Sequence, residues 1–316
     1  MTDESQLSVL SSVGAARRAH RRQSPRRRRE AVLGYAFLAP VTLVLLALLG
    51  YPLVKALIMS LHRQYVGFDV APFVGLRNYV DIVHDPTYWH AFQNTIVFTV
   101  ASVVLKLGLG LLTAIVLNRE FRGRGLARSV VLIPWALPTV VTVLVWSWMY
   151  NDSFGLVNHL LSGLHLAKPH SWLGDPSTAM PAVVVVDVWR GFPFFALILL
   201  AGLQGIPEEL YEVASIDGAG RWRQFRYVTW PGIATVALVV TLLSTIWTLN
   251  EFSLIWVLTQ GGPGDATTVL SVLTFKAAFL GNKLSYGVAV SATLLPIVVL
   301  LILALVRAVN RREATT

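Results

Sequence analysis

The sequence contains no cysteine and few charged residues, and each shortage excludes a class of protein. Without cysteine, neither a disulfide framework nor a thiolate metal site can form. Charged residues make up 14% of the chain, whereas soluble domains usually contain about 25%. Apolar residues make up 55% of the chain and are grouped in long blocks, which a soluble core does not require. Much of the chain is therefore expected to lie outside water.

Motifs for nucleotide binding and hydrolysis are also missing. No segment fits G-x-x-x-x-G-K-[ST], and the glycines of 261–264 are not followed by lysine. The sequence also lacks H-E-x-x-H, a convincing nucleophile–base arrangement, and any histidine deep within an apolar block. These gaps argue against an intramembrane enzyme. We expect a chain that is not an enzyme and holds no metal or cofactor of its own.

Six apolar blocks are long enough to cross a membrane as helices. A bilayer core about 30 Å thick needs ~20 apolar residues per helix. The blocks lie at residues 31–54 (extending toward 60), 92–117, 129–150, 179–204, 232–258 and 285–306. They lack the alternation of barrel strands, so helices must satisfy the backbone within lipid. The sequence predicts an all-α polytopic membrane protein with a basic tail at 1–30, a six-helix domain at 31–309 and a short C-terminus at 310–316.

The distribution of lysine and arginine predicts how the helices are oriented. If the N-terminus lies in the cytoplasm, the cytoplasmic segments hold 18 of the 26 basic residues and the outer loops hold five. The remaining three lie in or at the edges of the spans. This bias places both termini in the cytoplasm. The eight arginines before residue 30 could instead form a nucleic-acid patch, but a flank that orients the first helix agrees better with the apolar blocks. No nucleic acid is expected as a partner, and the first block is too long for a signal peptide.

The loop between the fourth and fifth blocks, residues 205–231, has the punctuation of a short helix. Pro207 suits a first helical position, the two glutamates after it complement the helix dipole, and Gly218 can end the helix. Leu210, Val213 and Ala214 recur at helical spacing and could share an apolar face. Such a helix could dock in a groove of a partner or rest on lipid head groups.

The spacing of this loop resembles the EAA loop of binding-protein-dependent ABC importer permeases, which reads E-A-A, three residues, G, nine residues, I-x-L-P. The matching positions are Glu212, Val213, Ala214, Gly218, Val228, Trp230 and Pro231, and Asp217 begins a D-G-A run typical of the sugar-type members. Three positions depart from the pattern, with Val213 in place of Ala, Val228 in place of Ile and Trp230 in place of Leu.

Other stretches resemble the sugar-permease branch of that family, and the resemblance covers residues 31–309. They are FVGLRNYVDI at 73–82, AGLQGIPEELYEVA at 201–214 and WVLTQGGPGDATTVL at 256–270. The resemblance implies the type I (MetI-like) permease fold, in a subunit of an ATP-driven sugar importer of the bacterial plasma membrane. It implies a second permease, an external solute-binding protein, and two ATPase subunits that hold ATP and Mg. It also implies that the ATPase is contacted by Glu212, Val213, Ala214, Asp217, Gly218 and Pro231.

Ionisable residues within the apolar blocks are candidates for the substrate pathway, because burying them in a membrane is costly. Asp187 and Arg190 are three residues apart on one helix face and could simply neutralise each other. Lys106 lies near the middle of the second block. It could line the pathway or pair with an acid on another helix.

The fifth block carries the pattern expected of a sugar site. Trp247, Asn250, Glu251 and Leu254 are spaced to share one face of a continuous helix. Polar groups suit sugar hydroxyls, and a flat aromatic ring suits the apolar face of the sugar. The same residues could instead join helices as polar contacts with a packing aromatic. The predicted pathway therefore comprises Trp247, Asn250, Glu251, Arg190, Asp187 and Lys106.

Two questions stay open in the sequence. An ion-coupled secondary carrier is the main alternative, although it predicts internal repeats, and none is visible. For the substrate, a di- or oligosaccharide is the first expectation, followed by a monosaccharide or polyol. Glycerol-phosphate is a further alternative, because Lys106 and Arg190 could bind a phosphate group.

Overall fold

The computed structural model describes residues 25–67, 71–165 and 168–313, and its regular structure is helical. Among these residues the one exception is an isolated bridge between His62 and Phe73. The predicted all-α class is thus confirmed. The chain divides into two compact units, Met1–Ile58 and Met59–Thr316.

The described part of the first unit, residues 25–58, lies in one long helix with a π-helical turn. It comprises α2 (Pro25–Leu45), η1 (Leu46–Gly50) and α3 (Tyr51–Ser60), whose last residues belong to the second unit. The apolar span within it, Leu33–Ser60, has 28 residues, and its most apolar window contains no buried residue. A helix that is apolar on all sides suits a lipid environment. The predicted tail lies outside the described residues up to residue 24, and α2 already includes its last arginines.

The second unit contains the remaining helices. In chain order they are α4 (Arg77–His84), α5 (Pro86–Asn118), α6 (Arg124–Ala136), α7 (Thr139–Met149), α8 (Leu156–Gly163), α9 (Pro176–Gln204), α10 (Glu209–Ile216), α11 (Arg221–Gln224), η2 (Phe225–Thr229), α12 (Trp230–Leu249), α13 (Ser253–Thr259), α14 (Leu270–Phe275), η3 (Lys276–Leu280), α15 (Leu284–Ala292) and α16 (Leu295–Glu313). Five helices of the described chain are long and apolar enough to cross a membrane, or six if the bent pair α6–α7 forms one span.

The two longest helices, α5 and α9, begin with the same Asp-Pro pair. The side chains of Asp85 and Asp175 accept hydrogen bonds from the backbone N–H groups of Thr87 and Ser177. Aspartate is a favoured N-cap, and proline at the next position has no N–H to leave unsatisfied. These caps fix where α5 and α9 start.

The core of the second unit is built on close packing of α5 against α9. Gly110 of α5 faces Phe195 of α9 so closely that an added Cβ would lie 2.4 Å from the Cβ of Phe195. Small residues allow membrane helices to approach in this way. The buried side chains around this crossing include Val103, Leu199 and Ile233, which extends the same core to α12.

The third predicted span is not one straight helix. α6 and α7 form an angle of 93° at Leu137–Pro138. The residue before a proline is driven out of the helical region, and Leu137 has an extended backbone with ψ of 138°. The span expected at 129–150 therefore consists of two helices with a sharp bend at one of its prolines.

The fifth predicted span is also interrupted. α12 ends at Leu249 with Asn250 as its C-cap, and α13 starts only at Ser253. The proposed single helix face through Trp247, Asn250, Glu251 and Leu254 is therefore wrong, because the chain leaves the helix in the middle of that set. The span starts earlier than predicted, at Arg221, since α11, η2 and α12 form one continuous apolar helix.

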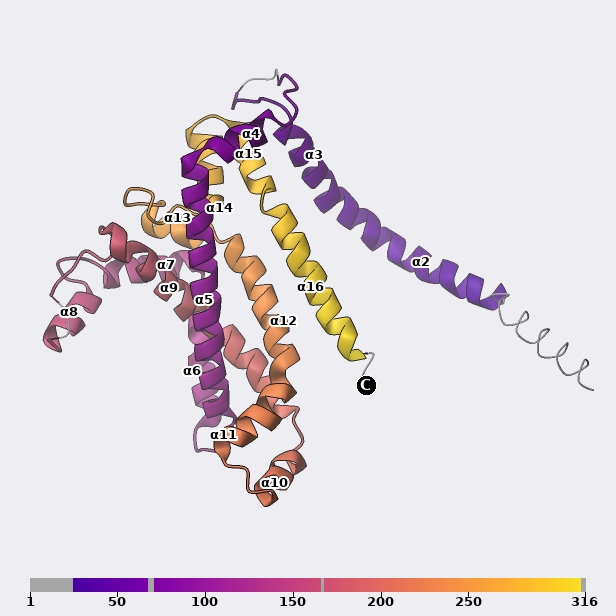
Figure 1. The fold of residues 1–316 in the computed structure, drawn as a ribbon, viewed down its shortest axis with the longest axis vertical. Coiled ribbons are helices and arrows are strands. Elements are labelled where there is room, and N and C mark those ends of the chain that lie inside the picture. Colours follow the sequence, from indigo (N-terminus) through magenta and orange to yellow (C-terminus); the bar gives the residue numbers. More distant parts are fainter. Residues whose placement is uncertain (1–24, 68–70, 166–167, 314–316) are drawn as a thin grey trace, which may run out of the picture. The chain divides into compact units, whose positions relative to one another are not determined.

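The short helices gather at the two ends of the long ones. In Figure 1, α10 and α11 lie at one end of α5 and α12, whereas α4 and the start of α15 lie at the other. α12 also packs against α5, α9 and α16, so these helices run side by side. The long helices therefore separate α10 and α11 from α4 and the start of α15.

Candidate functional site

A polar cavity of about 150 Å³, here called the midspan cavity, lies beside the middle of α9 and the break after α12. Its lining combines charged residues with aromatic ones. The lining residues are Lys106, Trp135, Asp187, Arg190, Gly191, Phe194, Phe195, Ser244, Trp247, Thr248 and Glu251.

The deepest contact of the cavity is an ion pair between α5 and α9. The Nζ atom of Lys106 lies 2.6 Å from Oδ2 of Asp187, and the two side chains are only 6% and 3% exposed. Lys106 also donates a hydrogen bond of 3.2 Å to Oγ1 of Thr248 on α12. The ammonium therefore joins three helices, and a charge this deeply buried requires such a partner.

Gly191 makes room for this lysine. A Cβ added at Gly191 would lie 2.5 Å from Cε of Lys106. No side chain could occupy that position without displacing the lysine. The stem of Lys106 thus crosses α9 at the one residue of that turn without a side chain.

Arg190 makes a second ion pair and joins both interrupted helices. Its Nη2 atom donates to Oε2 of Glu251 at 2.8 Å, within the break after α12. Its Nη1 atom donates to Oγ1 of Thr139, the first residue of α7 after the 93° bend. The planar guanidinium can hold two acceptors in fixed directions at once.

Glu251 itself stabilises the start of the next helix. Its Oε1 atom accepts from the backbone N–H of Leu254 at 3.0 Å, and its carbonyl accepts from Oγ of Ser271 at 2.7 Å. Both carboxylate oxygens are thus used, one by Arg190 and one by α13. Non-helical backbone at this depth is tolerated where protein groups satisfy it in this manner.

Three aromatic rings form a continuous row along the cavity. The ring centroids of Trp135 and Phe194 are 6.0 Å apart in a stacked arrangement, and those of Phe194 and Trp247 are 5.3 Å apart. More than half of each tryptophan is exposed. The row therefore offers an apolar wall beside the charged residues.

Five of the six predicted pathway residues meet in this cavity, namely Trp247, Glu251, Arg190, Asp187 and Lys106. Asn250 does not, since its side chain is exposed and donates to the carbonyl of Ile246 on its own helix. The expectation that Asp187 and Arg190 might neutralise each other was wrong, because each pairs with another helix or with the break. One expectation for Lys106, an acid on another helix, is confirmed.

Sequence reasoning missed several members of the cavity. Ser244 and Thr248 stand at i and i+4 on α12, with Trp247 on the same face, so a polar stripe could have revealed them. Trp135 and Thr139 could not have been placed, because the bend at Pro138 decides where they lie. Gly191 carries no signal except through its neighbour Lys106.

The loop between the fourth and fifth predicted spans, residues 205–231, is folded as the sequence predicted, with small shifts. α10 covers Glu209–Ile216, two residues later than Pro207, and Gly218 adopts φ of +73°, the left-handed conformation that ends a helix. The hydroxyl of Tyr211 lies 3.1 Å from that of Thr229, which ties α10 to η2. α10 therefore has a defined position on the second unit.

α10 presents an unusually apolar surface for an exposed helix. None of its residues is buried, and Ile216 is 86% exposed. The predicted contact residues fall on or beside it: Glu212, Val213 and Ala214 lie within α10, Asp217 is its C-cap, Gly218 follows, and Pro231 lies in the first turn of α12. Val213 and Pro231 line one apolar groove with Leu210 and Tyr227.

Comparison with known proteins decides the family. Residues 106–314 match the family described as "Binding-protein-dependent transport system inner membrane component". This match covers well over half of the chain. The chain belongs to that permease family. It is accordingly a multi-pass membrane component of a binding-protein-dependent transport system, and the resemblance drawn from the loop is confirmed.

Relatives of the permease are similar to it in sequence over most of its length. It is 43% identical over 273 residues to the "Trehalose/maltose transport system permease protein MalF" of Thermococcus litoralis, covering 86% of this chain and 91% of that protein. It is 37% identical over 276 residues to the "Inner membrane ABC transporter permease protein YcjO" of Escherichia coli, covering 86% and 92%.

Among solved structures, one described as a bacterial ABC transporter for import of the acidic polysaccharide alginate superposes on the permease with a TM-score of 0.73. The identity is 23%, with 92% of this chain and 97% of that chain covered. At this identity the likeness concerns the fold. The permease therefore has the predicted ABC importer fold.

Proposed function

We propose that this permease is the subunit through which an ATP-driven importer carries a neutral sugar, a di- or oligosaccharide, across the bacterial plasma membrane. The observation that supports the proposal is the midspan cavity, where an aromatic row stands beside polar groups. Aromatic faces and hydrogen-bonding groups together are what a sugar ring requires. The name of the Thermococcus litoralis relative, which mentions trehalose and maltose, points the same way.

The charges of the cavity favour a neutral substrate over glycerol-phosphate. Lys106 and Arg190 are matched by Asp187 and Glu251 in two contacts of 2.6 and 2.8 Å. A phosphate ester would need at least one cation free of a carboxylate partner. Because both cations are engaged, a phosphate would have to break a buried pair in order to bind.

A second permease subunit is expected to complete the site. The cavity measures about 150 Å³, whereas ligand pockets usually range from about 300 to 1,000 Å³. Trp135 and Trp247 each expose more than half of their surface in this chain. We propose that a partner permease covers these rings and supplies the remaining contacts, so that the sugar lies between the two subunits.

Transport by the reconstituted importer tests the proposal. The complex would be isolated from its native membranes in mild detergent and placed in proteoliposomes with internal ATP and its binding protein. Uptake of labelled maltose and trehalose would be measured for the natural chain, Trp247→Ala, and Trp148→Ala as matched control. Trp148 is 76% exposed on α7 and does not line the cavity. Trp247→Ala should reduce uptake about fivefold, since a stacking contact contributes about 1 kcal/mol.

Competition separates the substrate classes. Excess unlabelled disaccharide should abolish uptake, and glycerol 3-phosphate should leave it unchanged. Uptake of glycerol 3-phosphate without any sugar uptake would overturn the assignment of a sugar as substrate. The assignment of the chain to an ATP-driven importer would still hold. Equal loss of uptake in both tryptophan variants would remove the role proposed for the cavity.

We further propose that α10 docks on a partner ATPase in the cytoplasm, with both termini on that side. Support comes from the EAA spacing, the exposed apolar residues of α10 and the basic residues of the neighbouring segments. ATP and Mg would act in the ATPase, and α10 would pass the movement of the ATPase to the spans. An external binding protein would deliver the sugar at the opposite ends of the long helices.

Co-purification tests the docking of α10. Glu212→Lys should release the ATPase, because it reverses a charge at a motif position of the docking helix. Glu209→Lys makes the same charge change on the same helix outside the motif and should retain the ATPase. Release by both variants would indicate a nonspecific charge effect, and retention by both would exclude this docking mode.

A further inference from the structure

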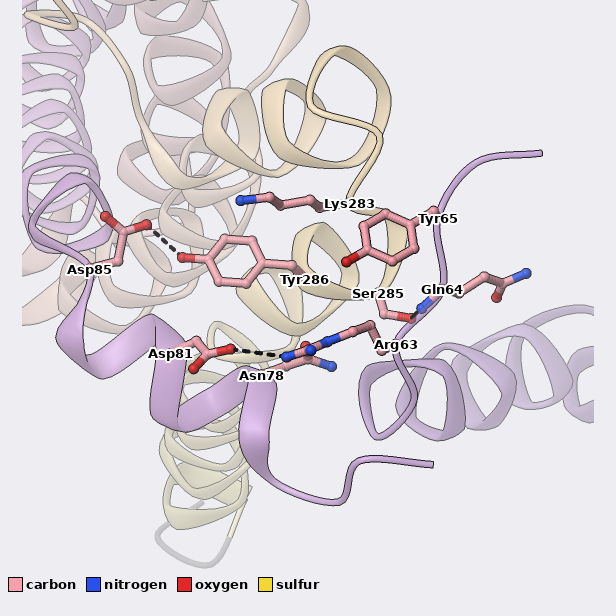
Figure 2. A pocket seen from close by; sticks show the side chains of 9 residues that line it. All are labelled: Arg63, Gln64, Tyr65, Asn78, Asp81, Asp85, Lys283, Ser285 and Tyr286. Carbon is pink, nitrogen blue, oxygen red and sulfur yellow. Dashed lines mark hydrogen bonds and ion pairs between the residues drawn. The ribbon is translucent and has the colours of Figure 1, made fainter. Parts of the chain in front are cut away.

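A second polar pocket lies at the end of the unit opposite α10, between α4 and the start of α15 (Figures 1 and 2). It is here called the α4–α15 pocket and has a volume of about 420 Å³. Its lining residues are Arg63, Gln64, Tyr65, Asn78, Asp81, Asp85, Lys283, Ser285 and Tyr286. None of them lines the midspan cavity, so the two pockets are separate.

Hydrogen bonds to backbone groups hold the walls of the α4–α15 pocket in place. The N–H of Gln64 donates to Oγ of Ser285 at 3.0 Å, and the N–H of Ser285 donates back to the carbonyl of Gln64 at 3.3 Å. The side chain of Asn78 donates to the carbonyls of Ser60 and His62 at 2.6 and 2.8 Å. Three segments far apart in sequence are thereby fixed before any ligand binds.

The pocket presents charges of both signs. Arg63 and Asp81 face each other with 3.7 Å between Nη2 and Oδ2, and both side chains are more than 40% exposed. On the other side, the hydroxyl of Tyr286 donates to Oδ2 of Asp85 at 2.6 Å, and the Lys283 side chain extends toward this pair (Figure 2). Among the described residues, Lys283 forms no ion pair.

Asp85 remains a carboxylate in this setting. Partial burial disfavours its charged form, but hydrogen bonds from Tyr286 and Thr87 outweigh that effect and lower the pKa of Asp85 below its usual range. The pocket therefore combines two carboxylates with two cations that are only loosely paired or free.

The position along the spans identifies the surroundings of the pocket. Asp85 directly precedes the span that starts at Pro86, and Ser285 and Tyr286 lie in the first turn of the span that starts at Leu284. The pocket is thus at the ends of two helices that are long and apolar enough to cross a membrane. Tyrosine and basic side chains at the ends of such helices contact lipid head groups.

We infer that the α4–α15 pocket binds the head group of a zwitterionic aminophospholipid, with the phosphate on Lys283 and Arg63 and the ammonium on Asp81 and Asp85. A head group that carries both charges matches a pocket that carries both, whereas an anionic head group would meet two carboxylates. A neutral sugar is less favoured, because it would offer no counter-charge to the cations and carboxylates of the pocket.

Native mass spectrometry of the full chain in detergent, titrated with defined lipids, tests this inference. The probes are phosphatidylethanolamine, which carries phosphate and ammonium, and phosphatidylglycerol, which carries phosphate alone. Lys283→Gln should weaken binding of both lipids by up to about fivefold, because it removes one exposed charge that the phosphate contacts. Asp81→Asn should weaken the binding of phosphatidylethanolamine by a similar factor. The binding of phosphatidylglycerol should stay unchanged or become tighter.

Lys168→Gln serves as the matched control, because Lys168 is another exposed lysine that does not line the pocket. It should bind both lipids like the natural chain. Both tested side chains are exposed, so the variants are expected to fold. The inference is overturned if Lys283→Gln and Asp81→Asn bind both lipids like the control, or if the natural chain prefers phosphatidylglycerol.

A third titration distinguishes a lipid from a soluble phosphate ester with the same head group. Phosphoethanolamine should compete at least about tenfold more weakly than the lipid, because it lacks the acyl chains that hold a lipid beside the spans. Equal affinity for phosphoethanolamine would assign the pocket to a water-soluble ligand and overturn the lipid assignment. The proposed sugar transport would stand in either case, since proteoliposome uptake measures it independently.

Discussion

The midspan cavity and the α4–α15 pocket contain the same numbers of positive and negative side chains, but they differ in how closely these are paired and how far they are exposed. Each has two cations and two carboxylates. In the cavity the contacts are 2.6 and 2.8 Å long, and the most exposed of the four side chains is 24% exposed. In the pocket the ion pair is 3.7 Å long and its side chains are 41% and 47% exposed.

The difference follows from the cost of desolvation. Away from water, an unpaired charge costs several kcal/mol, so every charged side chain of the cavity needs a partner of opposite charge. At the end of the spans, water and head groups solvate the same side chains, so a loose arrangement is stable. The cavity is therefore suited to a neutral substrate, and the pocket keeps groups available for a charged one.

The largest effect is expected from opening the buried pair of the cavity. Asp187→Asn removes the carboxylate and leaves the ammonium of Lys106 without a counter-charge at 6% exposure. Breaking a buried pair on one side should lower the free energy of unfolding by about 3–5 kcal/mol. SDS titration of the purified chain, followed by tryptophan fluorescence, would measure it.

The double variant Lys106→Met, Asp187→Leu is the control for this prediction. It removes both charges together, so it should recover most of the lost stability. A loss below about 1 kcal/mol for Asp187→Asn alone would place the pair in water-like surroundings and remove the contrast with the pocket.

Sequence patterns predicted the parts of the permease that depend on local rules. The approximate positions of the spans follow from the lengths of the apolar blocks, and the left-handed Gly218 follows from glycine conformation. The Asp-Pro starts of α5 and α9 obey such rules as well, but the predicted spans began later, at residues 92 and 179. The cavity residues were identified because charges within apolar blocks are rare. Their individual functions, like those of the α10 residues, remain proposals.

Pairing and helix breaks could not be predicted in the same way. Arg190 shares a helix face with Asp187, yet it pairs with Glu251, because the break at Asn250–Phe252 brings that carboxylate to α9. A long apolar block gives no sign of such a break when the backbone is satisfied by side chains from elsewhere. The partner of a buried charge depends on tertiary geometry that one sequence does not display.

A smaller effect is expected when the lysine is displaced and its partner is kept. In Gly191→Ala, the added Cβ would lie 2.5 Å from Cε of Lys106 and force its stem away from α9. Overpacking of this kind should cost about 1–3 kcal/mol of unfolding free energy. The same SDS titration would measure it.

Gly108→Ala on α5 is the matched control, because an added Cβ there meets no atom within 4 Å. Alanine is the better helix former, so this variant should keep or gain stability. In the background of Lys106→Ala, Gly191→Ala should lose its cost. If the cost persists in that background, the contact with Lys106 is not its cause.

The ion pair of the α4–α15 pocket should respond more weakly still. Arg63→Gln should change the free energy of unfolding by less than about 1 kcal/mol, because both partners are more than 40% exposed. The change should shrink further between 0.05 and 0.5 M salt, since the Debye length falls from about 14 to 4 Å. A cost as large as that of Asp187→Asn would show that exposure does not separate the two sites.

The smallest effect concerns how stability depends on pH. The pKa of Asp85 is lowered in the folded chain, in part by the hydrogen bond from Tyr286. A lowered folded-state pKa contributes stability above the ordinary carboxyl pKa of 3.8, and this contribution is lost as pH falls through the folded-state value. Tyr286→Phe removes that hydrogen bond, so the folded-state pKa of Asp85 should rise toward its ordinary value, and the loss of stability in acid should be smaller and should end at a higher pH. Thermal denaturation of both proteins from pH 6 to pH 3 would detect the shift. Identical pH profiles would mean that Tyr286 does not set the charge of Asp85, and that Thr87 and Tyr88 hold the carboxylate without it.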